Sequence, residues 1–195
     1  MAKMAAPWIK ICLGGTFNPI HYGHLICART AAEAIGANIV LVPCSLPPHK
    51  PDAADLASAE DRLQMCRLAI QGVDGFEIDD LEIRRGGISY TIDTVRELKS
   101  RGWPHVHWLI GTDQAATLPT WHRSQELLSE VQFVVMTRTG NNPAWQGAVR
   151  VPDIDISATQ IRRRVAAGLP IDFLTPPAVV DFIRRRGLWK TDSPP

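Results

Sequence analysis

Short apolar runs alternate along the chain with longer segments in which apolar residues recur every three or four positions. The short runs predict buried strands, and the longer segments predict helices that cover them. Strands are expected at residues 8–13, 39–42, 106–110 and 131–136, with shorter or weaker ones at 76–83 and 151–156. Helices are expected near residues 23–35, 58–70, 91–99, 121–128, 157–164 and 176–186.

Several of these helices carry boundary signals. Ser58 precedes Glu60 and Asp61, as in a capped helix start, and Thr91 is a plausible cap for the helix that follows it. The last helix has Thr175 as its expected cap, Pro176 at its first position and Gly187 at its end.

Strands that alternate with helices favour an α/β fold with a mostly parallel sheet and helices on both faces. Ligands then bind at the carboxyl ends of the strands. We find no internal repeat or dividing linker, so residues 1–195 are interpreted as one domain. Residues 140–147 are expected to form a mobile surface loop, and residues 191–195 a frayed tail.

The composition and charge of the chain argue against several classes of function. The 195 residues are 45% apolar and 21% charged, with a formal net charge of +1, so bulk charge gives no reason to expect a nucleic-acid or membrane partner. No apolar run is long enough to span a bilayer, and the N-terminal residues lack a secretory pattern. The cysteines lie in apolar contexts without framework spacing, which predicts a reduced cytoplasmic protein. They are Cys12, Cys27, Cys44 and Cys66.

Residues 14–24, Gly-Gly-Thr-Phe-Asn-Pro-Ile-His-Tyr-Gly-His, follow the first predicted strand. The glycine pair would let backbone N–H groups approach an anion, and the next helix points its positive end at the same place. His21 and His24 are three residues apart, so both could donate to oxygens held over the loop. A plain tight turn is the alternative for the glycines. A zinc pair is the alternative for the histidines, although zinc needs three or four protein ligands.

Two later stretches also suit phosphate. Residues 45–50 contain a Pro-Pro-His-Lys segment, for which an extended connector with a solvated Lys50 is the simpler interpretation. Ser157 and Gln160 form a capping box, while Thr159 and Arg162 would place a hydroxyl and a guanidinium beside free N–H groups. The neighbouring Arg163 and Arg164 are expected on a solvated face.

Further candidates lie between these stretches. Tyr90 and Thr91 open a helix, and Gly111 and Asp113 end a strand at the same edge of the sheet. Trp121 follows. A helix cap for Asp113 and a core role for Trp121 are the simpler alternatives.

Residues 14–24 match the G-G-[ST]-F-[DN]-P-x-H-x-G-H signature of the nucleotidyltransferase superfamily, and the chain most resembles bacterial nicotinate-nucleotide adenylyltransferases. Pro-Pro-His-Lys resembles the family's second motif, and residues 156–162 resemble its ATP β,γ-phosphate motif. Residues 89–94 and 111–121 also fit the pattern. Cys44 and Ser45 depart from it, because many relatives carry an amide there that contacts the mononucleotide.

The resemblance implies a Rossmann-like nucleotidyltransferase fold and a step of NAD biosynthesis, in which nicotinate mononucleotide (NaMN) and ATP give deamido-NAD and pyrophosphate. Because the acceptor phosphate is already ionised, no general base is required. Mg²⁺ is expected on the phosphates and water, with no dedicated protein ligands. The expected partners are the small molecules ATP and NaMN, and neither nucleic acid nor a membrane is expected. The resemblance is compatible with a homo-oligomer. Other acceptors, such as phosphopantetheine or nicotinamide mononucleotide (NMN), and a non-catalytic nucleotide-binding regulator are the alternatives.

The implied site residues fall into three groups. The expected catalytic residues are His21, His24, Lys50 and Arg162. The expected ATP-binding residues are Gly14, Gly15, Thr16, Phe17, His21, His24, Gly111, Asp113, Ser157, Thr159 and Arg162. The expected mononucleotide-binding residues are Cys44, Ser45, Lys50, Tyr90, Thr91, Trp121 and Arg138.

Overall fold

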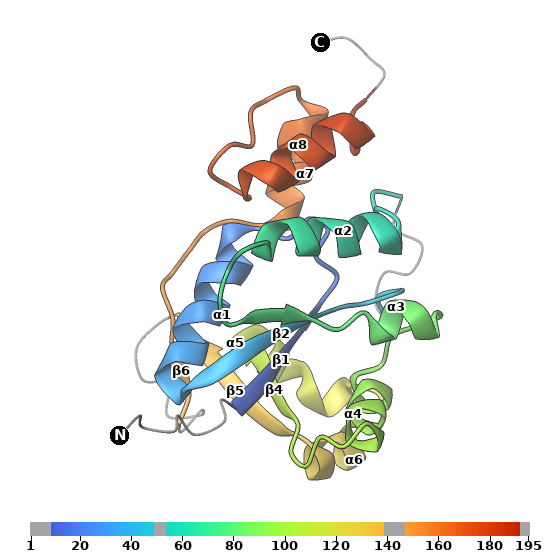
Figure 1. Cartoon of the computed structure of the whole chain (residues 1–195), viewed down its shortest axis with the longest axis vertical. Coiled ribbons are helices and arrows are strands. Elements are labelled where there is room, and N and C mark those ends of the chain that lie inside the picture. Colours follow the sequence, from blue (N-terminus) through green and yellow to red (C-terminus); the bar gives the residue numbers. More distant parts are fainter. Residues whose placement is uncertain (1–8, 49–53, 139–146, 192–195) are drawn as a thin grey trace.

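A parallel sheet with helices on both faces forms the body of the protein (Figure 1). The computed structural model describes residues 9–48, 54–138 and 147–191. Within these residues the sheet has six strands in the order β3-β2-β1-β4-β5-β6, and every neighbouring pair is parallel. The strands are β1 (Ile9–Gly15), β2 (Ala37–Pro43), β3 (Phe76–Ile78), β4 (His107–Gly111), β5 (Gln132–Thr137) and β6 (Val149–Arg150).

The helices are distributed between the two faces of the sheet. In Figure 1, α1 and α2 lie on one side of the sheet, α4 and α6 on the other, and α7 and α8 beyond α2. Their bounds are α1 (Tyr22–Ile35), α2 (Ala59–Ile70), α3 (Leu81–Arg85), α4 (Thr91–Ser100), α5 (Thr112–Thr117), α6 (Ser124–Glu130), α7 (Ala158–Ala166) and α8 (Pro177–Arg186), with a 3₁₀ turn η1 (Leu118–Thr120). The predicted α/β class is confirmed.

Successive residues of each strand point to opposite faces of the sheet, so the core has two parts. Ile11 and Leu13 of β1 are buried against the side of α1, α2, α7 and α8, whereas Cys12 between them is buried against the side of α4 and α6. In β4, Leu109 joins the first cluster and Ile110 the second. Strands buried on both faces read as continuous apolar runs, which is why the sequence predicted them.

Three predicted elements differ from the structure in their bounds. Residues 76–83 hold one strand and the start of α3, because the Asp79 carboxylate accepts from the Leu81 N–H at 3.1 Å and opens a short helix. The helix expected at 121–128 begins at Ser124, since Arg123 has a left-handed backbone (φ 53°) that no helix tolerates. Residues 151–156 lie outside the strands, although the Val151 N–H still donates to Thr137 at 2.9 Å.

At the last helix the cap lies one residue later than expected. Pro176 is the N-cap of α8, and the Thr175 hydroxyl donates instead to the Ile20 carbonyl at 2.7 Å. Thr175 therefore ties this helix to the segment before α1. By contrast, Ser58 caps α2 as expected, its hydroxyl accepting from Asp61 N–H at 3.0 Å.

The chain reverses direction across the sheet between β1 and β4, from which strands are added outward on both sides. At such a switch point the loops after the two strands separate to opposite faces and leave a crevice at the carboxyl ends.

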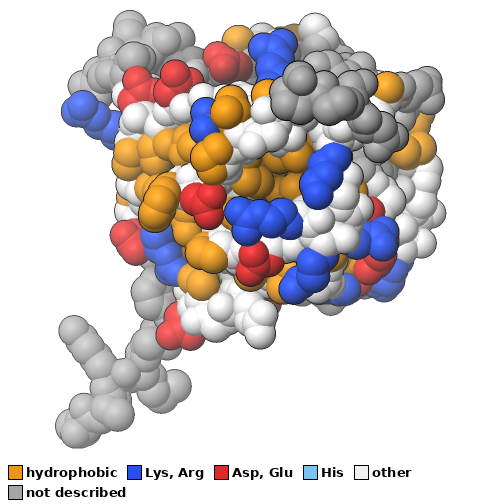
Figure 2. Space-filling model, turned by 90° about the horizontal axis from the view of Figure 1, so that it is seen from above, with side chains coloured by type: hydrophobic (Ala, Val, Ile, Leu, Met, Phe, Trp, Pro, Cys, Tyr) orange, Lys and Arg blue, Asp and Glu red, His pale blue; other side chains and the backbone are white. Residues whose placement is uncertain are grey.

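Charged side chains of both signs are interspersed with hydrophobic ones on the face seen from above (Figure 2). No helix in the described ranges is long and apolar enough to cross a membrane. Of the two segments expected to be mobile, residues 140–146 and 192–195 lie outside the described residues. Thr191, at the start of the expected tail, donates its hydroxyl to Ala166 at 3.1 Å.

Candidate active site

A cavity of about 1190 Å³ opens at the carboxyl ends of the central strands. Its walls come from the loop after β1, the start of α1, the turn after β2, the starts of α4, α5 and α7, and the segment around Trp121. Nearly all the predicted site residues line it. The two exceptions are Ser45, which is buried behind the wall, and Lys50, which lies outside the described residues.

The glycine pair at the end of β1 is required by side chains packed against it. A Cβ on Gly14 would lie 2.4 Å from Cζ2 of Trp108, and one on Gly15 would lie 2.9 Å from the ring of Phe17. Neither glycine has a positive φ, whereas Phe17 does, at 47°. The strained backbone of this loop is therefore at Phe17, where a non-glycine residue is held in an unfavourable region.

His21 and His24 lie together against this loop. His21 is the N-cap of α1, and the two imidazoles stack with ring centroids 3.7 Å apart and planes 24° apart. A Cβ on Gly23 would lie 3.0 Å from Nδ1 of His21, so the glycine between the histidines leaves room for the first ring. In the described part of the chain, Nδ1 of each ring is buried and has no hydrogen-bond partner.

Burial keeps both rings neutral at pH 7. Desolvation, with a smaller effect of Arg138, lowers the pKa of His21 to about 4. Desolvation, followed by the neighbouring His21, lowers the pKa of His24 well below 6.5. Both residues line the cavity, so the pair can offer a ring nitrogen to a ligand bound there.

The start of α7 forms a second part of this wall. Ser157 caps the helix by accepting from Gln160 N–H at 3.2 Å, as expected. Arg162 donates to the Asn18 carbonyl at 2.9 Å and to Thr159 Oγ1 at 3.3 Å, and its Nε lies 2.7 Å from a carboxylate oxygen of Asp55. The guanidinium thus reaches the glycine loop through Asn18, and Asp55 holds it there.

The opposite wall is built on the start of α4. Tyr90, rather than Thr91, is the N-cap, and no side chain caps the helix. Because the first bonded N–H groups are those of Asp93 and Thr94, the N–H groups of Thr91 and Ile92 have no partner within the helix. The Tyr90 ring stacks on His122, with centroids 4.1 Å apart.

Trp121 lies beside this helix start. Its ring packs edge-on against Phe133 with centroids 6.2 Å apart, and its Nε1 donates to Thr117 at 3.4 Å. It is only half-buried and lines the cavity, so part of the ring remains available to a ligand.

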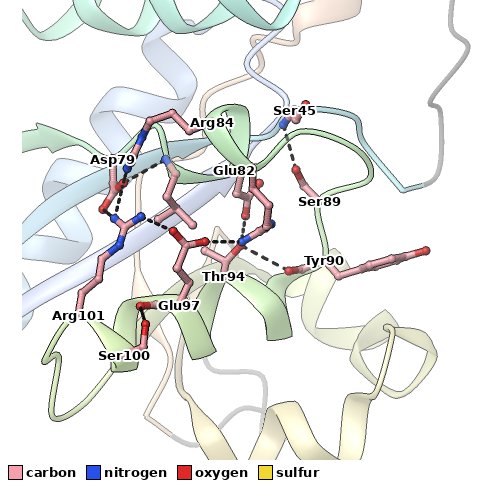
Figure 3. Close-up of polar contacts among 12 residues, drawn as sticks. Ser45, Asp79, Glu82, Arg84, Ser89, Tyr90, Thr94, Glu97, Ser100 and Arg101 are labelled. Carbon is pink, nitrogen blue, oxygen red and sulfur yellow. Dashed lines mark hydrogen bonds and ion pairs between the residues drawn. The ribbon is translucent and has the colours of Figure 1, made fainter.

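A buried polar network lies behind the α4 start (Figure 3). The Thr94 hydroxyl donates to Glu82 at 2.5 Å and accepts from Arg85 at 3.0 Å. The Ser89 hydroxyl accepts from the Ser45 N–H at 2.9 Å. Burial raises the pKa of Glu82, against which hydrogen bonds from Thr94 and Ser89 act. This network fixes the helix start to the turn after β2.

Arg138 lies with the histidines. It lines the same cavity as His21, His24 and Cys27, and its charge acts with burial to lower the pKa of His21. Gly111 and Asp113 line the cavity at the start of α5, where Gly111 N–H donates to the side chain of Gln114 at 3.2 Å.

Asp55 and Glu82 line the cavity and were not among the site residues predicted from the sequence. Asp55 lies 107 residues from its partner Arg162, and Glu82 fell in a stretch taken for a strand, so neither gave a local signal. His122 also lines the cavity, and its place directly after Trp121 was the signal that the sequence offered for it.

Comparisons with known proteins agree with this geometry. The family model described as cytidylyltransferase-like matches residues 12–164. The chain is similar to a probable nicotinate-nucleotide adenylyltransferase from Gloeobacter violaceus, with 42% identity over 90% of this chain and 93% of the relative. A probable nicotinate-nucleotide adenylyltransferase from Methylacidiphilum infernorum is 39% identical over 97% and 96%. Among solved structures, the Plasmodium falciparum nicotinic acid mononucleotide adenylyltransferase complexed with NaAD has a TM-score of 0.74 at 19% identity, covering 93% of this chain and 97% of that one.

Proposed function

The chain belongs to the nicotinate-nucleotide adenylyltransferase family, and we infer that it transfers the adenylyl group of ATP to NaMN, giving deamido-NAD and pyrophosphate. One observation carries this inference. A single cavity brings the glycine loop, the histidine pair and the start of α7 opposite the start of α4 and Trp121. It therefore has room for a nucleotide triphosphate and a mononucleotide with their phosphates between the two walls.

The reaction needs alignment more than acid–base chemistry. The NaMN phosphate is ionised at neutral pH, so one of its oxygens can attack the α-phosphorus of ATP in line while pyrophosphate leaves. The protein must hold the two phosphates in register and stabilise the charge that develops on the leaving group.

We assign that stabilisation to the wall of α1 and α7. Each neutral imidazole of His21 and His24 can donate one hydrogen bond to a phosphate oxygen. A nearby polyphosphate would also favour the protonated rings and oppose the effect of burial on their pKa. Arg162 and Thr159 supply a guanidinium and a hydroxyl for the outer phosphates.

We assign the acceptor to the wall of α4. The N–H group of Thr91, which has no partner within the helix and lies at the cavity wall, suits a carboxylate on the pyridine ring, and Trp121 offers a partly exposed face for stacking. Tyr90 and Cys44 would complete the surroundings of the mononucleotide.

Mg²⁺ is proposed to enter with the phosphates. In the three described segments, no group of three or more His, Cys, Asp or Glu side chains could hold a metal ion. The carboxylates of Asp55 and Asp113 line the cavity singly, which suits contacts to water molecules of a phosphate-bound ion. When bound, the ion would neutralise phosphate charge.

Pyrophosphate release with ATP and a panel of acceptors tests the function. We expect turnover with NaMN, less with NMN and none with phosphopantetheine, in agreement with the names of the similar proteins. Binding of ATP without turnover on any acceptor would instead support a nucleotide-binding regulator. We further propose that the enzyme works in the cytoplasm, where ATP is available.

A further inference from the structure

Arg62 of α2 is completely buried, with 0% of its surface exposed, and lies outside the cavity wall. Arginine is rarely buried to this extent unless a carboxylate neutralises it. Here the described acceptors of its guanidinium are four backbone carbonyls and the thiol of Cys44. A charge that makes so many bonds to neutral main-chain groups fixes backbone positions.

The four carbonyls come from three separate segments. Nη1 donates to Thr16 at 2.9 Å and to Cys44 at 2.6 Å, Nη2 donates to Ser45, and Nε donates to Ala57 at 3.0 Å. Thr16 belongs to the glycine loop of the ATP wall. Cys44 and Ser45 form the turn after β2, next to the mononucleotide wall. One planar guanidinium therefore holds the two walls together from behind.

By binding peptide carbonyls, Arg62 also fixes the direction of the N–H groups in the same peptides. The C=O and N–H of a trans peptide point in opposite directions. Because the Thr16 carbonyl points at Arg62, the N–H of Phe17 points away from it, where this loop lines the cavity. This is also the residue held at positive φ. Arg62 thus supports the strained conformation that presents the Phe17 N–H.

The same geometry operates at the turn after β2. The Cys44 carbonyl points at Arg62, and the N–H of the same peptide, that of Ser45, donates to Ser89 Oγ at 2.9 Å. Ser89 directly precedes Tyr90, the N-cap of α4. The connection from Arg62 therefore reaches the start of α4 through two hydrogen bonds (Figure 3 shows the second).

We propose that Arg62 is a positioning residue for both substrates, which sets the distance and orientation of the glycine loop relative to the start of α4. The proposal rests on the proposed function, because it assigns ATP to the first wall and NaMN to the second. Its distinctive consequence is that one side chain touching neither substrate controls the KM of both.

Arg62→Lys is the first test. Lysine keeps the charge but is a point donor without the planar fork, so it cannot bond four carbonyls in these directions. We expect a folded protein by circular dichroism, a higher KM for both ATP and NaMN, and kcat/KM lower by about tenfold or more. The matched control is Arg67→Lys on the same helix, since Arg67 is exposed and pairs with Asp80 and Glu60. It should leave both KM values unchanged.

Chemical rescue separates positioning from general stability. Arg62→Ala leaves a cavity shaped for guanidinium, and adding that ion below denaturing concentrations should restore activity to this variant and leave the activity of the wild type and of Arg67→Ala unchanged. An Arg62→Lys enzyme with wild-type KM values, or an Arg62→Ala enzyme that guanidinium does not improve, would overturn the proposal.

Ser89→Ala keeps the idea testable if the Arg62 variants do not fold. It removes the link to α4 and the hydrogen bond to Glu82 on the same wall, and leaves the bond of Arg62 to Thr16 intact. The KM for NaMN should therefore rise while the KM for ATP stays unchanged; equal effects on both, or none, would contradict the connection. ATP binding measured by calorimetry distinguishes a failure of the proposed function from a failure of the positioning role of Arg62. If the wild type binds ATP but does not use NaMN, the proposed function fails, and weaker ATP binding by Arg62→Lys would still support the positioning role.

Discussion

At the scale of single residues, the stacked imidazoles of His21 and His24 are the most informative pair. Replacing either by alanine should lower kcat by about 10²–10³, because each removes a preorganised donor that acts on developing charge. ATP binding should weaken much less. Steady-state kinetics and calorimetric ATP binding would measure the two effects.

A suitable control for these variants is His105→Ala, because His105 is exposed before β4 and lies outside the cavity lining. It should leave kcat unchanged. If a folded His24→Ala enzyme turned over at the wild-type rate, the histidines would have a structural role only.

A second prediction at the scale of single residues concerns Arg162→Lys. Lysine keeps the charge but loses the planar fork that now bonds Asp55, Asn18 and Thr159. We expect a KM for ATP raised by about tenfold, with the KM for NaMN little changed. The same exchange at the neighbouring Arg163 should have no effect, and an unchanged ATP KM in Arg162→Lys would remove α7 from the triphosphate site.

At the scale of elements, the uncapped start of α4 should determine which acceptor is used. A nicotinate carboxylate can accept from the N–H group of Thr91, which has no partner within the helix, whereas the amide of NMN would have to turn its NH₂ away or leave that N–H unpaired. The lost hydrogen bond costs about 1–3 kcal/mol, and the lost attraction to the helix end about 0.3–1 kcal/mol. We therefore expect kcat/KM to favour NaMN by about 10–10³.

Comparing the two mononucleotides at fixed ATP and Mg²⁺ measures this preference directly. Equal values, or a preference for NMN, would exclude carboxylate recognition by α4 while leaving adenylyl transfer intact.

The elements also show what the sequence could and could not predict. The central strands were predictable because burial on both faces leaves continuous apolar runs, and α2 because Ser58 caps it. The short helix α3 was not, since its alternating apolar residues resemble a strand and only the side-chain bond from Asp79 reveals the turn. Bonds of that kind depend on geometry that sequence spacing does not determine.

The residues of the candidate site were predictable only where they lie in contiguous motifs. Residues in contiguous motifs, such as His21, His24 and Thr159, could be predicted, and the structure places them in one cavity. Arg62 and Asp55 could not, because their partners lie far away along the chain and include main-chain carbonyls that carry no sequence signal. The sequence also could not show why residue 14 must be glycine, since the side chain that a Cβ there would contact belongs to Trp108.

At the scale of the whole molecule, the neutral histidines should make stability depend on pH. The unfolded chain binds protons on these rings near pH 6.5, and the folded chain does not until about pH 4 for His21. Because the unfolded state then binds more protons, stability is lost as the pH falls from 6.5 to 4. A shift of this size for His21 corresponds to about 3 kcal/mol. Glu82 acts in the opposite sense, since its pKa is raised.

Chemical denaturation at pH 7, 5.5 and 4.5 would measure this dependence. His21→Leu should flatten the decline between pH 6.5 and 4, whereas His105→Leu should not. A wild-type stability that rises as the pH falls over this range would contradict the neutral assignment.

The contact between Gly14 and Trp108 constrains the order in which this sequence can change. A methyl group at Gly14 would lie 2.4 Å from the indole, so Gly14→Ala alone should disrupt the junction of β1 and β4. Trp108→Leu would remove the obstacle first, and the alanine could then enter at a lower cost. A double-mutant cycle should give a coupling free energy of about 0.5–3 kcal/mol. Lineages of this enzyme should therefore lose the tryptophan before they lose the glycine, and a homologue with alanine at this position should carry a smaller side chain opposite it.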